Sequence, residues 1–563
     1  MTEKEKYEQW LGRDDLDAEV RAQLEEMRGN DNEIFESFYR DLEFGTAGLR
    51  GILGAGTNRM NIYTVGKATM GFARYLKENF QAPSVAIAYD CRKNSKLFAW
   101  ISARIMAASG VRVYIYHELM PTPMLSYAVR YYHCDGGIMI TASHNPAQYN
   151  GYKVYGPDGC QAGPEMADSI LKYISQIGVF DARPAGEDDE HITVIPQSVI
   201  DDYIDTIISL RVAEDKDAVK ALKVVYTPLN GTGRMPIAKM MEKIGLTQVH
   251  VVPEQELPDG NFTTCPYPNP ENREALAMGM ELGKKTQPDI VLATDPDADR
   301  VGIAVNHRGE FVLVTGNEMG VLLLDYICRV KEAGKTMPRN PVAVKTIVTT
   351  AMVDDVAAYH HVKLESVLTG FKFIGEIISA LEAQGRLEDY LLGFEESYGY
   401  LASGHVRDKD AVSTAMLICD MAAYYKKQGK TLIDVLEELS QKFGYYKNRT
   451  VSFSFEGASG MEKMAAIMER LRSDMPEAVA GAKIVEVSDY RASVTTDSAG
   501  QRPILLPKSN VLGYKLADGC SFVVRPSGTE PKLKIYIFAK ADSAQKALER
   551  VDGLKEALQA LIE

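Results

Sequence analysis

The sequence lacks the cysteine spacing of a disulfide scaffold or a zinc site. Its seven cysteines, at positions 91, 134, 160, 265, 328, 419 and 520, are odd in number and scattered, and none forms a C-x-x-C pair. Disulfide frameworks and structural zinc sites both rely on closely spaced cysteine pairs. We therefore expect reduced thiols and a cytoplasmic location.

Features of membrane proteins and nucleic-acid binders are also missing. No apolar stretch approaches the roughly 20 residues that span a bilayer, and the segment from Met1 to Lys6 has no apolar run typical of a secretion signal. The 63 Lys and Arg residues are outnumbered by 77 Asp and Glu, so the formal net charge is -14. Proteins that bind nucleic acids are more often basic. We predict neither a membrane nor a nucleic-acid partner, and the oligomeric state has no signature in the sequence.

Apolar runs typical of buried strands alternate with helical stretches along most of the chain. At 563 residues the chain exceeds a single core, and this alternation predicts β-α-β units with parallel-rich sheets. Strands are expected at 85–90, 111–116, 222–226, 289–294 and 341–344, and helices at 95–109, 234–244 and 351–359. Residues 5–42 are typical of charged amphipathic helices, with Trp10, Leu11, Leu16 and Val20 as one apolar stripe. We expect an α/β fold with three similar units.

The last part of the chain has a different pattern. A helix is expected at 459–473, strands near 483–488 and 521–525, and a strand at 533–538 before a terminal helix. This order favours a smaller α+β unit at the C-terminus.

Three aspartates follow the apolar run at 289–294. Asp295, Asp297 and Asp299 occupy alternate positions, and in an extended chain alternate side chains point the same way. Three like charges on one side need a cation, and three single oxygens suit a Mg²⁺ ion that keeps other positions open. An EF-hand is excluded, because Arg300 and Asn306 stand where its glycine and glutamate are needed. The competing interpretation is a solvated acidic turn.

Ser143 follows another apolar run, at 137–140, within the sequence TASHNPA. A serine before Asn-Pro is commonly only a turn or capping residue. His144 beside it and Lys153 further on could supply proton transfer and charge compensation. No G-x-S-x-G surrounds this serine, which argues against a serine hydrolase. A serine able to carry phosphate and a carboxylate cation site are together the two halves of a phosphoryl-transfer site.

Each of three other polar segments can be interpreted either as part of a binding site or as an ordinary turn or loop. RPSGTEP at 525–531 has an arginine, hydroxyls and a glycine, which favour a phosphate cradle or a polar hairpin turn. FEESYG at 394–399 offers acceptors for sugar hydroxyls, a second metal site or an exposed turn. RDKD at 407–410 is, by itself, typical of a solvated loop.

Taken together, these segments resemble the α-D-phosphohexomutases. TASHNP at 141–146, DPDADR at 295–300, FEESYG and RPSGTEP occur in that family's order, and the resemblance extends from FGTAGLR at 44–50 to the last strand. The bacterial phosphoglucomutase branch is the most similar, because it has an N-terminal helical extension like residues 1–42. The resemblance implies four domains around a central cleft. They are 1–205 with the extension and the phosphoserine, 206–318 with the metal site, 319–446 for the sugar, and 447–563 for the phosphate.

The resemblance also implies a role for each matched residue. Ser143 would carry the catalytic phosphate, and one of its oxygens would join Asp295, Asp297 and Asp299 around Mg²⁺. The residues around the transferring phosphoryl group would be Arg50, His144, Lys153 and Arg300. The sugar would be bound by Thr369, Gly370, Phe371, Lys372, Glu395, Ser397 and Lys409. The phosphate that does not react would be held by Arg525, Ser527, Gly528 and Thr529.

The implied activity is that of a phosphoglucomutase. It would interconvert α-D-glucose 1-phosphate and glucose 6-phosphate through phosphoserine and glucose 1,6-bisphosphate, which is both intermediate and activator, with sugar phosphates as the small-molecule partners. The double acid at 395–396 favours glucose, since the phosphomannomutase/phosphoglucomutase branch has Gly-Glu-Met-Ser there. A pentose-phosphate branch has a related GFEE start, so phosphomannomutase and phosphopentomutase stay open. A metal-dependent phosphatase would not need the cradle at 525–529, and a non-catalytic sensor would need neither Ser143 nor the aspartates.

Overall fold

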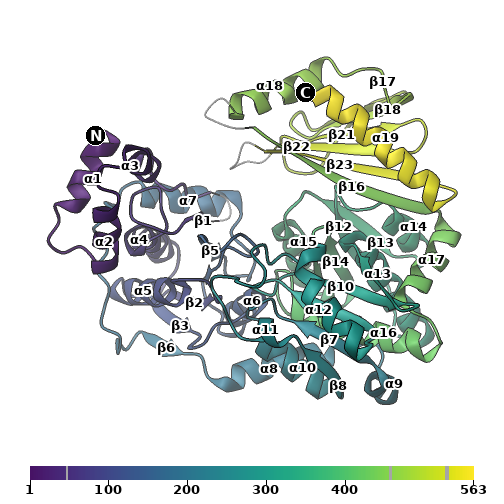
Figure 1. Ribbon diagram of the computed structural model, residues 1–563, viewed down its shortest axis with the longest axis horizontal. Coiled ribbons are helices and arrows are strands. Elements are labelled where there is room, and N and C mark those ends of the chain that lie inside the picture. The colour runs from purple at the N-terminus through teal and green to yellow at the C-terminus, as the bar shows by residue number, and fades with distance from the viewer. Residues whose placement is uncertain (46–47, 456–459, 527–531, 563) are drawn as a thin grey trace.

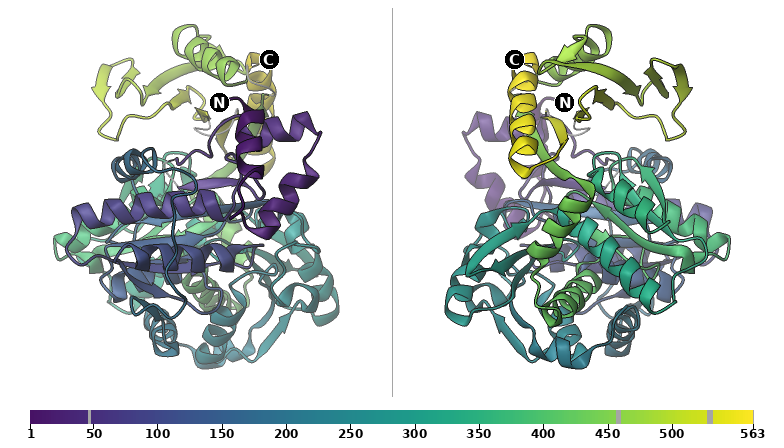
Figure 2. Two further views of the ribbon diagram at one scale, coloured as in Figure 1. Left: turned by 90° about the vertical axis from the view of Figure 1, so that its left-hand side faces the viewer. Right: turned by 90° about the vertical axis from the view of Figure 1, so that its right-hand side faces the viewer.

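Four sheets follow one another along the chain and form four structural units (Figure 1). The structure, a computed structural model, describes residues 1–45, 48–455, 460–526 and 532–562. In both side views the C-terminal unit stands at one end of the molecule, above the other three (Figure 2). The expected class, three mixed α/β units and a smaller C-terminal α+β unit, is confirmed.

The first unit has a six-stranded sheet in the order β1-β5-β4-β2-β3-β6, parallel between β4 and β6 and antiparallel at the β1 edge. β4 is buried along its whole length, so its sequence is a continuous apolar run rather than an alternating one. Its strands are β1 (Leu49–Ile52), β2 (Ser84–Tyr89), β3 (Arg112–Ile115), β4 (Gly136–Ile140), β5 (Tyr149–Tyr155) and β6 (Ile192–Val194). Its helices are α4 (Ile62–Asn79), α5 (Ser95–Ala108), α6 (Thr122–Tyr131), α7 (Pro164–Ile174) and α8 (Gln197–Ser209).

Three short helices precede this sheet, as the apolar stripe predicted. They are α1 (Glu3–Leu11), α2 (Ala18–Glu26) and α3 (Asp31–Phe38). Trp10, Leu16 and Val20 lie in a small core of their own, with Leu11 partly buried against it. Trp10 meets the Phe38 and Phe180 rings at centroid distances of 5.6 and 4.9 Å, which attaches the extension to the first unit.

The second unit has a five-stranded sheet in the order β11-β10-β9-β7-β8. Its strands are β7 (Lys223–Thr227), β8 (Gln248–Val251), β9 (Ile290–Thr294), β10 (Val301–His307) and β11 (Glu310–Val314). Its helices are α9 (Lys216–Ala221), α10 (Arg234–Ile244), α11 (Pro253–Glu256) and α12 (Arg273–Thr286). The strands β7, β8 and β9 are parallel, whereas β9, β10 and β11 are antiparallel.

The third unit has a four-stranded sheet in the order β13-β12-β14-β15, with only the β14–β15 pair antiparallel. Its strands are β12 (Val342–Thr346), β13 (Lys363–Val367), β14 (Tyr390–Glu395) and β15 (Gly399–Leu401). Its helices are α13 (Gly316–Ala333), α14 (Met352–Tyr359), α15 (Phe371–Ala383), the 3-10 turn η1 (Leu387–Asp389), α16 (Ala411–Lys427) and α17 (Leu432–Phe443).

The C-terminal unit is antiparallel throughout its described pairs, in the order β16-β23-β22-β21-β18-β19-β20 with β17 on β18. Its strands are β16 (Tyr445–Ser454), β17 (Ala478–Val479), β18 (Ala482–Asp489), β19 (Val494–Asp497), β20 (Gly500–Pro503), β21 (Leu512–Leu516), β22 (Ser521–Pro526) and β23 (Lys532–Ala541). Its helices are α18 (Gly460–Ser473) and α19 (Ala544–Ile562).

The hydrophobic cores show that the four units are not packed on one another to the same extent. One continuous cluster runs through the first three units, from Ala86 to Leu439. The C-terminal unit has a separate core. A small apolar cluster connects Val348, after β12, to Val511, Val523 and Tyr536 of the C-terminal sheet. The first three units are therefore packed together more extensively than the fourth is packed on them.

The expected domain divisions stay a proposal. The predicted boundary at 205–206 falls inside α8, that at 318–319 inside α13, and that at 446–447 inside β16. No helix within the described ranges is long and apolar enough to cross a membrane.

Candidate active site

The loop after β4 holds Ser143 in an uncommon conformation. Its φ is 52°, in the left-handed region that a residue with a side chain seldom adopts, and only 5% of it is exposed. The Ser143 backbone N–H donates to Thr141 Oγ1 at 2.8 Å, and that hydroxyl donates to Asp90 Oδ2 at 2.6 Å. Such strain persists only where the surroundings determine it, and it is common at functional sites.

Arg92 fixes the same loop from the end of β2. Its guanidinium donates to the carbonyl oxygens of Ser143 at 2.5 Å and of Pro146 and Tyr149 at 3.0 Å each. It also lies 3.3 Å from Asp90 Oδ2. Sequence reasoning missed both residues, although their position directly after a buried strand was a usable signal. Ligand-binding loops of open α/β sheets gather at such strand ends.

The aspartate run is a tight turn, so the expectation of an extended run was wrong. Strands β9 and β10 pair antiparallel directly before and after it, and the chain must reverse between them. Ala298 has φ 47°, and Asp295 Oδ1 accepts the backbone N–H groups of Asp299 at 3.1 Å and Arg300 at 3.0 Å. The three carboxylates converge nevertheless, with one oxygen from each within 4.8 Å of the others.

A second loop, which follows β7, packs closely against this turn. A Cβ atom on Gly231 would lie 2.6 Å from Pro296 Cα, so only glycine fits there. The backbone N–H and the hydroxyl of Thr232 donate to the Pro296 carbonyl at 2.8 and 3.0 Å. The Asn230-Gly231-Thr232-Gly233 segment, expected only to join a strand to a helix, thus positions the aspartates.

The structure brings the serine and the aspartates together from two units. Ser143 Oγ donates to Asp295 Oδ2 at 3.0 Å, and Thr122 Oγ1, from α6, donates to Asp297 Oδ2 at 2.8 Å. Asp297 Oδ1 and Asp299 Oδ1 are buried without a hydrogen-bond partner. Two orphaned oxygens beside a third carboxylate are the hard donors that Mg²⁺ prefers. The described residues therefore fit a divalent cation.

Burial and mutual repulsion disturb the titration of these acids. Burial, with Asp297 and Asp299 nearby, raises the pKa of Asp295 well above its usual range. Burial and Asp297 raise the pKa of Asp299 in the same way. Burial would also raise the pKa of Asp297, but Lys153 and hydrogen bonds hold it below its usual range. The cluster thus carries more negative charge than its protein neighbours compensate, a condition that a bound cation relieves.

Two lysines approach the aspartates from different units. Lys153 Nζ, from β5, lies 3.0 Å from Asp297 Oδ2 and 3.9 Å from Asp299 Oδ2. Lys409 Nζ lies 3.2 Å from Asp299 Oδ2 and 3.2 Å from Asp408 Oδ1. The RDKD run is therefore a buried part of the site and not the solvated loop that its composition suggested.

The position of Lys409 follows from the start of α16. Asp410 caps that helix, and its Oδ1 accepts the N–H groups of Val412 at 2.8 Å and Ser413 at 3.0 Å. The same carboxylate accepts the Tyr203 hydroxyl at 2.9 Å and lies 2.8 Å from His405 Nε2. The cap thereby fixes the residue before it beside the aspartates.

The other residues expected near the phosphoryl group differ in what they contact. His144 Nδ1 lies 3.2 Å from Ser143 Oγ. Burial, with Arg300 and Arg50 nearby, lowers the pKa of His144 well below its usual range. Arg50, on β1, donates to Asn145 Oδ1 at 3.4 Å. Arg300 is turned toward Glu271 Oε1, at 2.6 Å, which is a partner that the sequence did not suggest.

A cleft of about 620 Å³ extends from this cluster to the C-terminal unit. Glu395 Oε1 accepts the Gly370 N–H at 2.9 Å, which joins the two expected sugar loops. Lys372 is an exception, because its ammonium lies over the Phe373 ring at 5.2 Å and outside the cleft lining. The expected residues that line the cleft are His144, Arg300, Thr369, Gly370, Phe371, Glu395, Ser397, Lys409 and Arg525.

The far wall of the cleft belongs to β16, β22 and β23. Arg525 is the last residue but one of β22, pairs with Lys534 of β23, and lies close to the Tyr536 hydroxyl. Lys534 and Tyr536 were not expected, although they follow RPSGTEP on the next strand. The predictions for Ser527, Gly528 and Thr529 fall on residues 527–531, which lie outside the described residues.

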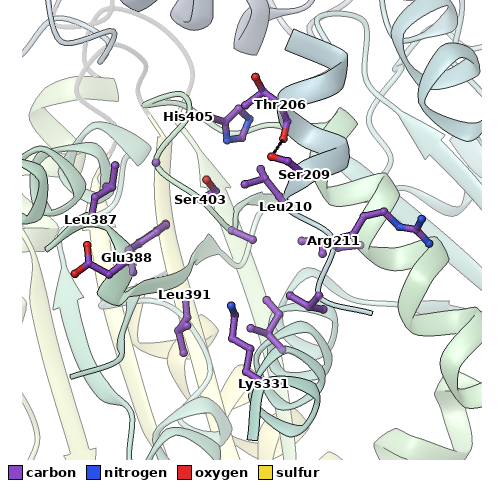
Figure 3. A pocket seen from close by; sticks show the side chains of 16 residues that line it. Thr206, Ser209, Leu210, Arg211, Lys331, Leu387, Glu388, Leu391, Ser403 and His405 are labelled. Carbon is purple, nitrogen blue, oxygen red and sulfur yellow. Dashed lines mark hydrogen bonds between the residues drawn. The ribbon is translucent and has the colours of Figure 1, made fainter. Parts of the chain in front are cut away.

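A second cavity, of about 510 Å³, lies between the end of α8, α13 and the β14–β15 region (Figure 3). Its Arg211 guanidinium points away from the centre and donates to both Asp420 carboxylate oxygens, at 2.9 and 2.8 Å. Its described lining includes one acidic side chain, Glu388, and no cluster of carboxylates. Of these two cavities, the cleft is therefore the one that adjoins described carboxylates able to hold a cation.

Comparison with known proteins agrees with this geometry. The chain matches four family models, the phosphoglucomutase/phosphomannomutase α/β/α domains I, II and III at residues 41–179, 201–309 and 315–443, and the C-terminal domain at 469–553. A phosphoglucomutase of Staphylococcus aureus (strain USA300) is 37% identical over 533 residues, covering 93% of this chain and 94% of the relative.

Solved structures that share the fold include two mutases. The Paramecium phosphoglucomutase pp63/parafusin, in an open form, has a TM-score of 0.67 at 20% identity, covering 93% of this chain and 96% of that one. The N-acetylphosphoglucosamine mutase of Aspergillus fumigatus, in complex with GlcNAc-6P and magnesium, has a TM-score of 0.50 at 14% identity, covering 97% and 100%. The chain thus belongs to the phosphoglucomutase/phosphomannomutase family and is a phosphohexomutase, an isomerase that transfers a phosphoryl group.

Proposed function

We propose that this phosphohexomutase interconverts α-D-glucose 1-phosphate and glucose 6-phosphate through phosphoserine 143 and glucose 1,6-bisphosphate. The observation that carries the proposal is the hydrogen bond from Ser143 Oγ to Asp295, 3.0 Å long, within the buried triad of aspartates beside the cleft. The relative at 37% identity is named a phosphoglucomutase, which supports glucose as the sugar.

Mg²⁺ is the proposed cofactor, held by Asp295, Asp297 and Asp299 with an oxygen of phosphorylated Ser143. When bound, the ion would neutralise charge on the transferring phosphoryl group. The A. fumigatus mutase carries magnesium and a sugar phosphate together, which supports this assignment. Lys153 and Lys409 lie against the same carboxylates and balance the charge that remains.

The transfer requires one bond exchange in each half-reaction. A sugar hydroxyl, O6 of glucose 1-phosphate or O1 of glucose 6-phosphate, forms a bond to phosphorus while the bond to Ser143 Oγ breaks. The proton of that hydroxyl must leave, and Ser143 Oγ is released as an alkoxide that needs one. His144 Nδ1, 3.2 Å from Ser143 Oγ, is placed to exchange a proton there. Lys153 instead faces Asp297 and Asp299.

The bisphosphate must then turn around so that its other phosphate returns to Ser143. We propose that Thr369, Gly370, Phe371, Lys372, Glu395, Ser397 and Lys409 hold the sugar in both orientations. Arg525, with Ser527, Gly528 and Thr529, would grip the phosphate that does not react. Arg50 and Arg300 would lie toward the transferring group, which requires Arg300 to exchange Glu271 for phosphate.

Sugar choice is the direct test of this function. With catalytic glucose 1,6-bisphosphate and Mg²⁺ present, kcat/KM for glucose 1-phosphate should exceed that for the mannose, glucosamine and ribose 1-phosphates by about tenfold or more. Phosphorus NMR follows all four isomerisations alike. Equal or faster reaction of mannose or ribose would reassign the sugar, and release of free phosphate without isomerisation would indicate a phosphatase.

Ser143→Ala should lose at least about 10³-fold of the mutase activity, because no side chain can then store the phosphoryl group. Mass spectrometry of the active wild type should place one phosphate on the peptide that contains Ser143. Ser169→Ala, on the exposed face of α7, is the matched control and should keep full activity. A fully active Ser143→Ala protein would remove the serine from the mechanism.

Asp297→Asn keeps the size of the side chain and removes one charge from the cation site. The Mg²⁺ concentration for half-maximal rate should rise about tenfold or more, since a buried charge lost from a cation site costs more than about 1.4 kcal/mol. Chelation with EDTA should abolish the mutase activity of the wild type, and added Mg²⁺ should restore that activity. Asp188→Asn, in an exposed loop, should behave as wild type, whereas a rate unaffected by exhaustive chelation would contradict the metal site.

Arg525→Ala should raise KM for glucose 1-phosphate about tenfold to hundredfold, the usual cost of a lost charge-assisted hydrogen-bond pair. The bisphosphate should also escape before it turns around, so the variant should need more added glucose 1,6-bisphosphate. Arg525→Lys should recover little, because lysine cannot copy a bidentate grip. Arg502→Ala, paired with Glu486 and Asp497 elsewhere in the same unit, is the control. Coincident activator curves for Arg525→Ala and wild type would show that Arg525 is only a turn residue.

A further inference from the structure

The cavity shown in Figure 3 lies outside the reaction site and has the composition of a small-molecule pocket. Its volume of about 510 Å³ falls within the range of roughly 300 to 1,000 Å³ that is usual for ligand pockets, which are mostly apolar with a few polar groups. No residue of its described lining also lines the cleft. A large part of its wall is formed by the apolar side chains of Leu210, Val212, Ile327, Leu387, Leu391 and Leu417.

Two polar groups of this lining are left without partners. Lys331 is half-buried on α13, and its side chain extends toward the other lining side chains (Figure 3). Among the described residues, neither its ammonium nor the Ser403 hydroxyl has a hydrogen-bond or ion-pair partner. The other charged side chains are turned elsewhere, since Arg211 is paired with Asp420 and the exposed Glu388 lies at the outer edge (Figure 3). The described lining therefore offers one positive charge that nothing compensates.

Two walls of the cavity meet at Asp410. His405, which lines the cavity, places its Nε2 2.8 Å from Asp410 Oδ2. Tyr203 lies about one helical turn before Thr206, which lines the cavity from α8, and the Tyr203 hydroxyl donates to Asp410 Oδ1 at 2.9 Å. The Tyr203 and His405 rings are 6.2 Å apart. Because Tyr203 and Asp410 are fully buried, a displacement of either wall reaches Asp410.

Asp410 directly follows Lys409, whose ammonium lies 3.2 Å from Asp299 Oδ2 in the reaction site. Asp410 caps α16 by accepting the first N–H groups of that helix, so it cannot move without the residues on either side of it. Side chains in a close-packed interior pass on small displacements instead of absorbing them. A molecule bound in the cavity is thus mechanically connected to the aspartates through Asp410 and Lys409.

We infer that the cavity binds a small monocarboxylate with an apolar body, and that this occupant alters the mutase rate through Asp410 and Lys409. Lys331 and Ser403 donate hydrogen bonds to the carboxylate, and the leucine side chains of the wall cover the apolar body. One free positive charge matches a monocarboxylate better than a phosphate monoester, which carries about two negative charges. Such binding requires no particular sugar substrate, so it stands apart from the choice of glucose in the proposed function.

Methyl NMR of the intact enzyme with Mg²⁺ tests the binding site directly. Sodium hexanoate is titrated into protein labelled at the isoleucine methyl groups. The signal of Ile327, identified through Ile327→Val, should shift with a Kd of about 1 mM. Hexylamine has a similar chain with the opposite charge, and acetate has the charge without the chain. Neither should shift this signal at concentrations at which hexanoate saturates it, because each lacks one half of the recognised chemistry.

Lys331→Gln removes the positive charge and should raise the Kd of hexanoate about tenfold or more, as expected for a lost charge-assisted hydrogen bond. Ser403→Ala should raise it about threefold or more, the usual effect of losing one hydrogen bond from a hydroxyl. Lys335→Gln, at an exposed lysine just beyond α13 that does not line the cavity, is the matched control and should leave the Kd unchanged. Without hexanoate, all three variants should have the mutase activity of wild type, because none of these side chains belongs to the reaction site.

The mutase rate tests the link to the reaction site. With saturating hexanoate, and with whichever sugar 1-phosphate the enzyme converts fastest, kcat/KM should change about fivefold, at the lower end of what is usual for coupled sites. Lys331→Gln should show no such change at the same hexanoate concentration. Tyr203→Phe removes the hydroxyl that joins α8 to Asp410, and it should keep the Kd of hexanoate while reducing the effect on the rate.

Three results would each overturn the binding site: an Ile327 signal that stays in place far above the expected Kd, an equal shift with hexylamine, or an unchanged Kd in Lys331→Gln. Hexanoate that binds in this cavity without altering the rate would overturn the link through Asp410. The proposed function is unaffected by any of these results. Its own failure would be a different sugar preference or the release of free phosphate, neither of which moves the Ile327 signal.

Discussion

The site depends on one electrostatic constraint, which is that three carboxylates converge inside the protein with too few partners of their own. The turn between β9 and β10 forces them together, and two of their oxygens are buried without a hydrogen bond. The neighbouring groups of the site place hydrogen-bond donors or positive charges against these carboxylates. A serine from one unit, Lys153 from the same unit and Lys409 from a third reach the same carboxylates. Side chains from three sheets therefore meet at these carboxylates.

The way in which the hydrophobic cores are divided determines how rigidly each of these groups is held. The aspartates, the serine loop and Lys409 stand on units that share one continuous core, so their relative positions are fixed by packing. Arg525 stands on the C-terminal unit, which has its own core and touches the third unit through a small apolar cluster. In the proposed function the rigid part holds the groups that would react, and the less firmly attached part would hold the phosphate that does not react. A bisphosphate that turns around in the cleft, as proposed, would require both properties.

Much of this arrangement was accessible from the sequence. Buried strands can be recognised as apolar runs in the sequence, and ligand-binding loops follow the ends of such strands. The positions of the serine loop, the aspartate run and the C-terminal strands were therefore predicted. The failures have one cause, which is dependence on contacts far apart in the chain. The spacing of Asp295, Asp297 and Asp299 suggested an extended run, but the pairing of β9 with β10 imposes a turn. Arg92 and Glu271 act only through partners that folding brings to them. Composition likewise gave no sign that RDKD is buried.

The continuous core of the first three units also has a consequence for the growing chain on the ribosome. Its members include Ala86 at one end and Leu439 at the other, so the cluster cannot close until α17 has been synthesised. The apolar side chains of early segments that belong to this cluster stay uncovered until the late segments arrive, a state in which chains are prone to aggregate. Among its described residues the C-terminal unit contributes only the partly buried Tyr446 of β16 to this cluster, and its own core can form afterwards as a separate event. The order of synthesis therefore brings the serine and aspartate loops together before the sheet that carries Arg525 is complete.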